Sequence, residues 1–454
     1  MRIKPVIETH ITAARFPGEG VGTHDGLPVY IKNALPGQRV EARLLKKRKD
    51  RCEGALLQVL ERAPEEVDSF CPHFGQCGGC SRQTLPYEAQ LRLKAQLYSQ
   101  VLTEAGIEPA VSEPILASPV IYGYRNKMEY TFGDEIKGGP LTLGMHRMTR
   151  ASDVITTDRC RIAPEDFNRI QGAVLAWARE KGYAQYNRFR DEGFLRNLIL
   201  RRGVYTGELL VALCTTSYDA LDEAGFLALL QGMALEGTIV GVLHLVNDRT
   251  GDVVRADSQR VLFGRDWYEE QLMGLKFRVS FFSFFQTNPA AAQLLYAKAI
   301  SYFSGLEGKE VFDLFSGTGT LAQVMAAKAS RVTAVELVPD AVAAARQNAQ
   351  LNGIENCTFI AGDVFEVLSS LDHKPECILV DPPRAGITPK AWDKILSYGV
   401  EEIVYISCNP VTLAENLAAA LKQGYRVIKS CAVDQFPHTP HLECVVGLQK
   451  KKSL

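Results

Sequence analysis

The sequence lacks any apolar run long enough to span a membrane, and no signal-peptide-like apolar segment follows Met1. Its 454 residues carry a formal net charge of only −1, so overall charge does not indicate a nucleic-acid partner. It also lacks internal repeats and low-complexity segments. Hydrophobic residues make up 46% and charged residues 23%, as in ordinary globular proteins. We therefore expect a cytoplasmic protein of several domains with no membrane partner.

Cysteine, by contrast, is plentiful. In a cytoplasmic protein, eleven cysteines indicate metal binding, catalysis or burial rather than disulfides. Cys71, Cys77 and Cys80 lie close together, and the two glycines before Cys80 allow the backbone to turn both flanking thiolates toward one point. A fourth ligand must come from elsewhere, and Cys160 is the nearest candidate along the chain. The spacing leaves zinc and an iron–sulfur cluster open, with an accidental group of structural cysteines as a third alternative.

Residues 1–62 show short alternating segments broken by glycine and proline turns, which predicts a small open β-barrel. Within residues 1–60, eleven Lys or Arg stand against six Asp or Glu, and the run at 46–49 is wholly basic. That run is either a solvated loop or a patch that contacts phosphates. Residues 181–205, with six basic side chains against two acidic ones, leave the same alternatives open.

Periodicity predicts a helix over residues 86–105, and residues 120–150 and 185–260 are predicted to form strands and hairpins. From about residue 270 strands alternate with helices, which indicates a doubly wound parallel sheet. We therefore expect an α/β protein with three domains. They are the small barrel at 1–62, a mostly β central domain at 63–270 that contains the clustered cysteines, and a Rossmann-like domain at 271–454.

The segment 310–322 combines a strand, a glycine turn and a helix, so a ligand can approach the backbone at a helix N-terminus. The next strand ends at Glu336, where an acid can accept hydrogen bonds from both hydroxyls of a ribose. Asp363, after the following strand, is placed to reach an adenine edge. These features fit S-adenosylmethionine and a nicotinamide cofactor equally well.

A further strand runs into Asp381-Pro382-Pro383-Arg384, whose prolines stiffen the turn over the cofactor. Enzymes that methylate exocyclic amines place an aromatic residue after such prolines. Arg384 therefore argues against amine methylation, and it is suited to contact a base carbonyl or a phosphate.

Another buried strand ends at Ser407-Cys408-Asn409-Pro410, which holds Cys408 at the carboxyl end of the strand. Ligands bind at that edge of open α/β sheets, although a lone buried cysteine is more often a small apolar filler. Near the start of a later strand stands Glu443, in apolar surroundings that raise a carboxyl pKa. The alternative is a surface glutamate beside a turn.

Together these motifs closely resemble those of the RNA uracil-5-methyltransferases, the enzymes that form 5-methyluridine in ribosomal and transfer RNA. The resemblance spans nearly the whole chain. Its most specific parts are Asp-Pro-Pro-Arg, Ser-Cys-Asn-Pro and His-x-Glu in this order. One departure is Thr320, where many members have Asn.

The resemblance implies a role for individual residues. Cys408 would be the nucleophile and Glu443 the base, and Phe284 would stack on the target uracil. S-adenosylmethionine would be contacted by Gln286, Phe315, Glu336 and Asp381. A 4Fe–4S cluster would be held by Cys71, Cys77, Cys80 and Cys160.

Members of this family that act on transfer RNA generally lack the N-terminal barrel, known as a TRAM domain, and the cluster. Their presence here favours 23S ribosomal RNA as the substrate of a monomeric enzyme. In the family a helical stretch around residues 84–115 packs on the catalytic domain, which would make the domains discontinuous. The alternatives are a transfer RNA enzyme, a 5-methylcytosine enzyme, a non-catalytic RNA-binding protein on this scaffold, and a nicotinamide oxidoreductase.

Overall fold

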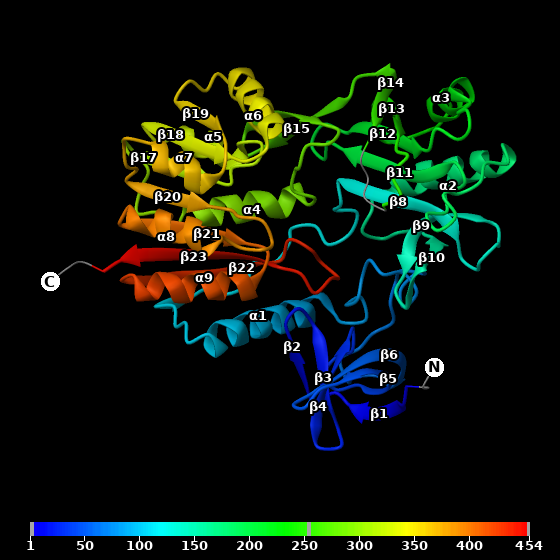
Figure 1. Ribbon diagram of the computed structural model, residues 1–454, viewed down its shortest axis with the longest axis horizontal. Coiled ribbons are helices and arrows are strands. Elements are labelled where there is room, and N and C mark those ends of the chain that lie inside the picture. Colours follow the sequence, from blue (N-terminus) through cyan, green and yellow to red (C-terminus); the bar gives the residue numbers. More distant parts are fainter. Residues whose placement is uncertain (1–3, 252–255, 452–454) are drawn as a thin grey trace.

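The computed structural model describes residues 4–251 and 256–451, and three sheets dominate it (Figure 1). In that view the N-terminal sheet lies below, the central sheet above it on the right, and the C-terminal sheet on the left. A two-stranded hairpin, β15 (Trp267–Leu272) with β16 (Leu275–Ser280), follows the central sheet and precedes the C-terminal one.

The N-terminal sheet has the strand order β1-β5-β6-β4-β3-β2. Alternating buried and exposed side chains give it one apolar face, which curls around a small core that includes Val29, Ile31 and Val40. In the described residues its edge strands β1 and β2 do not pair, so the predicted barrel is a half-barrel. Its strands are β1 (Val6–His10), β2 (Ala13–Arg15), β3 (Glu19–His24), β4 (Leu27–Lys32), β5 (Arg39–Lys47) and β6 (Cys52–Glu61).

The central sheet has the order β10-β9-β8-β11-β12-β13-β14 and is covered by two helices that periodicity did not predict. The first helix buries Phe167, Val174 and Trp177, and the second buries Phe226. The elements are β8 (Lys127–Asp134), β9 (Leu141–Arg147), β10 (Arg150–Thr156), α2 (Glu165–Glu180), β11 (Leu195–Arg202), β12 (Glu208–Thr215), α3 (Glu223–Gln231), β13 (Thr238–Val246) and β14 (Ser258–Gly264).

The C-terminal sheet has the order β19-β18-β17-β20-β21-β23-β22-β7, with helices on both faces. Its strands are β17 (Glu310–Leu314), β18 (Arg331–Glu336), β19 (Cys357–Ala361), β20 (Cys377–Val380), β21 (Glu402–Ser407), β22 (Tyr425–Val433), β23 (Glu443–Lys450) and β7 (Val111–Ser112). The helices are α4 (Pro289–Ile300), α5 (Thr320–Ala326), α6 (Pro339–Leu351), α7 (Val364–Ser370), α8 (Pro389–Ser397) and α9 (Pro410–Lys422).

The strand order of this sheet reverses at β17. The chain first builds outward through β18 and β19, and then returns to add β20 on the other side of β17. Asp381, directly after β20, donates its backbone N–H to Leu314 O at 3.3 Å. A crevice forms at such a reversal, outside the carboxyl ends of the strands, and this is where doubly wound folds bind ligands.

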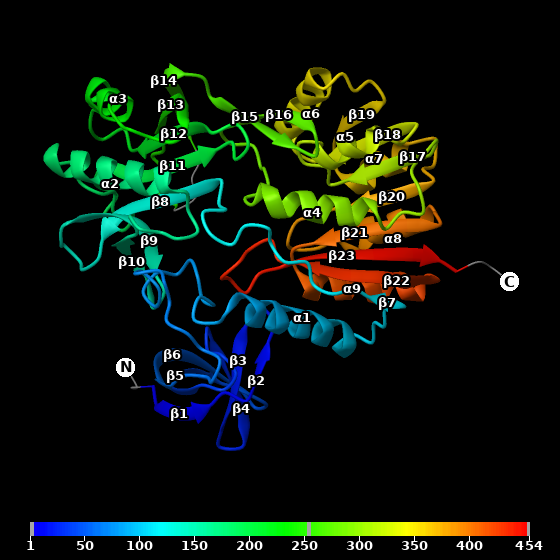
Figure 2. The ribbon, with the colours of Figure 1, turned by 180° about the vertical axis from the view of Figure 1, so that it is seen from behind.

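One early segment joins this C-terminal body. The helix α1 (Tyr87–Glu104) packs against α9, and β7 pairs with β22 (Figure 2). The buried face of α1 holds the polar side chains Gln90 and Lys94 beside Leu97 and Leu102. A purely apolar stripe would only seal the core, so buried polar groups on this face indicate specific partners.

Candidate active site

One edge of the C-terminal sheet gathers most of the predicted site residues. Phe315 directly follows β17, Glu336 ends β18, and Asp381 follows β20. Cys408 stands just beyond β21. Because β23 runs antiparallel to β21, its first residue, Glu443, lies at the same edge.

Cys408 and Glu443 face each other across two neighbouring strands. Ser407 is paired with Cys444, so continuing the register by one position sets Cys408 opposite Glu443. Glu443 is 5% exposed, and burial, together with repulsion from Asp381, raises its pKa well above the usual range. A carboxylate that holds a proton this readily suits a general base acting on a carbon-bound proton.

The thiol of Cys408 lies among groups that oppose its ionisation. Burial raises its pKa to about 11, and the negative charges of Glu443 and Asp381 contribute to the rise. Arg384 has the opposite effect on this pKa. The carbonyl of Arg384 accepts a hydrogen bond from Asn409 Nδ2 at 3.1 Å, which holds residue 384 beside the turn that contains Cys408. The N-terminus of α9, two residues after Cys408, also favours a thiolate.

Three carboxyl groups lie together at the crevice. Asp313 in β17 is 1% exposed, and its carboxyl faces the backbone N–H of Ala322 in α5. Burial and the nearby Asp381 and Glu336 raise its pKa well above the usual range. Burial also raises the pKa of Asp381 to about 7. This group fits a positively charged ligand such as a sulfonium, and it disfavours the pyrophosphate of a nicotinamide cofactor.

Sequence reasoning missed Asp313. The available signal was an acid inside an otherwise apolar strand, since an aspartate is rarely buried without a partner or a function.

The glycine turn between β17 and α5 is tightly built. Phe315 has a φ of +66°, a left-handed conformation that is strained for a bulky residue. Gly319 has a φ of +71°, and a Cβ there would lie 2.5 Å from the Phe359 ring, so only glycine fits. Gly317 donates its N–H to Glu336 Oε2 at 3.0 Å, which fixes the carboxylate beside the turn.

Asp363 has a different local role from the one expected. It is exposed and caps α7, where its Oδ1 accepts from the backbone N–H groups of Phe365 and Glu366 at 2.9 and 3.3 Å. This cap accounts for the aspartate through helix stability alone. Its contact with adenine stays a prediction.

Gln286 and Phe284 lie on the segment that leads into α4. The Oε1 atom of Gln286 accepts from Gln435 Nε2 at 3.4 Å, and its carbonyl accepts from Asn126 Nδ2 at 3.0 Å. Gln435 belongs to the loop at residues 434–442, here called the β22–β23 loop, which leads to Glu443. Phe284 is 69% exposed, so its ring face is open to a planar ligand.

The β22–β23 loop is held by α1. Lys94 Nζ donates to Asp434 Oδ1 at 2.6 Å and to Phe436 O at 3.0 Å. The two charged side chains are 3% and 0% exposed. Periodicity along α1 could not reveal this pair, because its members lie 340 residues apart in the sequence.

His438 in the same loop has two further sets of partners. Its backbone N–H donates to Gln90 Oε1 at 2.9 Å, and its Nδ1 lies 3.1 Å from Gln90 Nε2. Its carbonyl accepts from the N–H groups of Ser81 and Arg82 at 3.0 and 3.1 Å. These two residues follow Cys80 directly, so the cysteine segment contacts the loop that positions Glu443.

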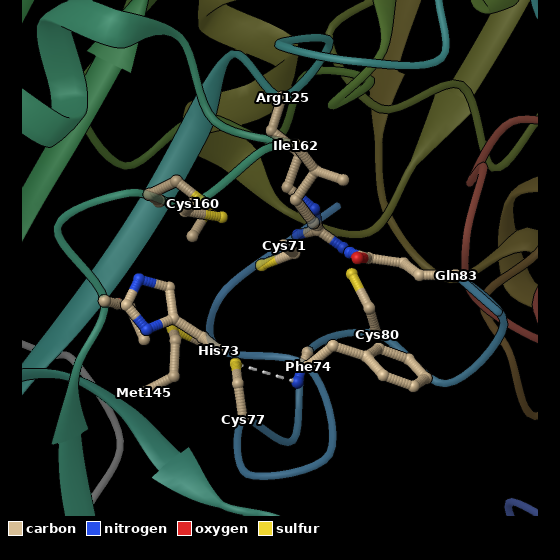
Figure 3. Close-up of a pocket in the computed structure, with 13 residues that line it drawn as sticks. Cys71, His73, Phe74, Cys77, Cys80, Gln83, Arg125, Met145, Cys160 and Ile162 are labelled. Carbon is tan, nitrogen blue, oxygen red and sulfur yellow. Dashed lines mark hydrogen bonds between the residues drawn. The ribbon is translucent and has the colours of Figure 1, made fainter. Parts of the chain in front are cut away.

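The four predicted ligand cysteines line one cavity of about 70 Å³ (Figure 3). Cys71, Cys77 and Cys80 come from one loop, and Cys160 comes from the segment after β10. Burial raises the pKa of Cys77 to about 11 and that of Cys80 to about 12. Thiols in such surroundings stay neutral unless a cation stabilises the thiolates. Within the described ranges, no three His, Cys, Asp or Glu side chains are grouped as ligands of a metal ion.

A family model for tRNA (uracil-5-)-methyltransferases matches residues 246–451. Across its full length the chain is 43% identical to an uncharacterized RNA methyltransferase of Clostridium tetani, over 454 residues and 100% of both proteins. It is also 43% identical to one of Clostridium acetobutylicum, over 451 residues and 99% of each. The chain belongs to the RNA uracil-5-methyltransferase family.

A solved structure of this family has the same fold. The tRNA (uracil-54, C5)-methyltransferase of Pyrococcus abyssi, in complex with S-adenosyl-L-homocysteine, gives a TM-score of 0.77 at 25% identity. The match covers 97% of this chain and 100% of that one. The protein is thus an S-adenosylmethionine-dependent RNA uracil-5-methyltransferase. This excludes the oxidoreductase alternative, in agreement with the carboxyl groups at the crevice.

For an RNA uracil-5-methyltransferase, the crevice holds what the reaction requires: a thiol, a proton acceptor opposite it, and carboxyl groups suited to a sulfonium. Among the described helices, none is long and apolar enough to cross a membrane.

Proposed function

We propose that this enzyme methylates C5 of a uridine in 23S ribosomal RNA, with Cys408 as nucleophile and Glu443 as base. The observation that carries the assignment is the placement of a thiol and a buried, easily protonated carboxyl on opposing strands at the cofactor edge. The alternatives for a lone cysteine and a surface glutamate lose support, because Glu443 is buried and Cys408 faces it.

The order of steps follows from the chemistry of uracil. Its C5 is a poor nucleophile, so the Cys408 thiolate first adds to C6, and the electron pair of the C5–C6 bond shifts toward C5 and the carbonyl. S-adenosylmethionine supplies the methyl group, which C5 accepts. The Glu443 carboxylate then takes the C5 proton, the double bond re-forms, and the C6–S bond breaks to return the thiolate. The uracil must leave the RNA stack to reach these groups.

We assign supporting roles on the same basis. Phe284 stacks on the target uracil, Arg384 contacts a carbonyl or phosphate of the RNA and favours the thiolate, and Glu336 binds the ribose. The remaining cofactor contacts are assigned to Gln286, Phe315, Asp363 and Asp381. The full burial of Asp313 beside Asp381 and Glu336 adds it to this set.

Four cysteines around one cavity support an iron–sulfur cluster more than zinc. Thiolates on a single tetrahedral zinc lie only about 3.8 Å apart, given Zn–S bonds of about 2.3 Å. A 4Fe–4S cluster places each thiolate on a different iron, so its ligands stand further apart around a larger core. The four cysteines line one cavity of about 70 Å³, which offers the four thiolates that such a cluster takes.

We further propose three functional units: a TRAM-like RNA-binding half-barrel at 1–62, a cluster-bearing unit at 63–270 and the methyltransferase at 271–454. The separate core of the N-terminal sheet supports the first. The packing of α1 on α9 and the pairing of β7 with β22 support a discontinuous boundary, with this segment belonging to the methyltransferase.

Transfer RNA is the second candidate substrate. The Pyrococcus abyssi structure is that of a tRNA enzyme and matches 97% of this chain, so an N-terminal extension does not by itself select ribosomal RNA. The deciding experiment incubates the protein with labelled S-adenosylmethionine and unmodified ribosomal and transfer RNA, and then maps the labelled base. Label at C5 of a uridine in 23S RNA is expected. Label in transfer RNA alone would reassign the substrate, and label on another base would overturn the mechanism.

A further inference from the structure

Two aromatic rings, not one, face outward beside the site. In the segment 281–285, Phe281 and Phe285 are 3% and 5% exposed, whereas Phe282 is 51% exposed and Phe284 is 69% exposed. The inward rings belong to the core between the hairpin and the C-terminal sheet. Phe282 lies mostly outside that core, and together with Phe284 it forms an exposed apolar surface that can bind a ligand.

A buried arginine fixes the turn that presents these rings. The guanidinium of Arg201 on β11 donates through Nη1 to the carbonyls of Ser280 and Ser283 at 3.0 and 2.8 Å, and also to that of Phe281. Arg201 is 1% exposed, and its Nη2 also donates to the Tyr268 hydroxyl at 3.5 Å. Charge-assisted bonds to three carbonyls in one turn restrict its motion. The outward rings therefore stand on a rigid support.

The ring of Phe282 is also oriented. It meets Phe281 edge-on, with centroids 5.1 Å apart and an interplanar angle of 89°. Two residues along a chain span at most about 7 Å between Cα atoms, so the rings of Phe282 and Phe284 can serve neighbouring bases of one strand. Single-stranded RNA is recognised largely by stacking unpaired bases on such rings.

We propose that Phe282 forms a second base subsite, on which the nucleobase adjacent to the target uridine stacks. The proposal rests on the assignment of Phe284 to the target base and adds a neighbour to it. A flipped uracil leaves its neighbour with one unstacked face. Phe282 offers that face a ring at a fixed position and so helps to select an unpaired sequence context.

The test uses short single-stranded RNAs with one central 5-fluorouridine, whose fluorine the base cannot remove, so that the adduct with Cys408 stays covalent and fixes the register. One RNA is intact, one lacks the base on the 5′ side of the target, and one lacks the base on the 3′ side. The rate of adduct formation with S-adenosylmethionine is measured against RNA concentration. The half-saturating concentration reports binding, and the limiting rate reports chemistry.

With the intact RNA, Phe282→Ala should raise the half-saturating concentration by roughly 5- to 100-fold. Phe282→Leu should behave similarly, because it keeps apolar packing against Phe281 but offers no ring face. Phe282→Tyr should retain the affinity of the unaltered protein. Phe263→Ala, a matched change of a phenylalanine 40% exposed on β14, should have no effect.

The decisive result is whether the effect of Phe282→Ala depends on the presence of one neighbouring base. On one of the two abasic RNAs, the unaltered protein and Phe282→Ala should bind equally, because the partner of the ring is gone. An equal loss for Phe282→Ala on all three RNAs, or no loss on any, would overturn the second subsite. If the unaltered protein forms no adduct with any of the RNAs, the proposed mechanism fails instead, so the two failures are distinguishable.

Discussion

In the proposed mechanism Cys408 reacts as a thiolate, although its surroundings favour the neutral thiol. Burial and two neighbouring carboxyl groups raise its pKa to about 11, and Arg384 is the positively charged side chain that opposes them. We infer that the Cys408 thiol is largely protonated in the free enzyme.

Alkylation of Cys408 in the free enzyme should therefore depend steeply on pH. A raised pKa stabilises the protonated form, so the rate should grow about tenfold per pH unit and still rise above pH 9, whereas an ordinary thiol levels off near 8.5. Arg384→Met should slow alkylation several-fold at any pH below the plateau. Iodoacetamide labelling of the Cys408 peptide, followed by mass spectrometry, measures both effects. A plateau near pH 8.5, or an unchanged rate in Arg384→Met, would contradict the assigned electrostatics.

The two catalytic residues should fail in different ways. Cys408→Ala should abolish methylation, by more than about 1,000-fold, and should form no covalent adduct. Glu443→Gln should still allow addition and methyl transfer but block loss of the C5 proton. Methylated RNA should then remain attached to Cys408 and survive denaturing gel electrophoresis. Normal turnover in Glu443→Gln would refute its role, and an adduct in Cys408→Ala would point to another cysteine.

Among single residues, sequence motifs predicted the side chains that the structure gathers at one edge of the C-terminal sheet, because each stands at the end of a buried strand. They could not reveal that Asp313 lies beside Asp381 and Glu336, since such contacts are a tertiary property. They also assigned Asp363 to the cofactor, which stays a prediction, and they did not show that this aspartate caps α7.

Among the elements, the β22–β23 loop depends on α1. Lys94→Met leaves the Asp434 carboxylate buried without its partner, and such a change costs about 3–5 kcal/mol. We expect a lower melting temperature and a displaced Glu443, so that the covalent RNA adduct accumulates as in Glu443→Gln.

The control on α1 is Arg92→Met. Arg92 pairs with Glu65 in the open, with both side chains more than half exposed, so little change is expected. The double variant Lys94→Met/Asp434→Leu removes both buried charges and separates stability from positioning. If the Lys94→Met enzyme is slow but accumulates no covalent RNA adduct, the β22–β23 loop does not position Glu443.

The cysteine loop gives a separate prediction. Protein purified without oxygen should be brown and carry about four irons per chain. Cys77→Ser and Cys160→Ser should lose iron, whereas Cys357→Ser, a partly buried cysteine far along the chain, should retain it. Metal analysis and absorption spectra provide the measurement. Stoichiometric zinc without iron would overturn the cluster.

Element by element, periodicity predicted α1 and the alternating strands and helices after residue 270. It passed over α2, although Phe167, Ile170 and Val174 carry a helical spacing in its sequence. It also counted residues 181–205 as a possible basic face. Arg196 and Arg201 are 6% and 1% exposed there, which a count of charges cannot show.

For the whole molecule, the N-terminal sheet should contribute RNA affinity through its exposed lysines. Within the described residues, Lys46 and Lys49 are exposed and form no ion pair, whereas Lys47 lies near Asp25. Replacing Lys46 and Lys49 with alanine should weaken RNA binding and reduce the slope of log K for RNA binding against log salt concentration by about 0.7–0.9 per lysine. Affinity for S-adenosylmethionine should stay unchanged. Lys328→Ala, an exposed lysine outside this sheet, serves as control. An unaltered salt slope would refute phosphate contact by this surface.

The contact of Ser81, Arg82, Gln90 and Lys94 with the β22–β23 loop limits how this protein can be divided. The family model begins at residue 246, and a fragment cut there would keep the thiol, the base and the cofactor turn. It would lose every one of those four partners of the loop. The methyltransferase is therefore not a portable module: grafted onto another RNA-binding domain, it would need residues 81–112 as well.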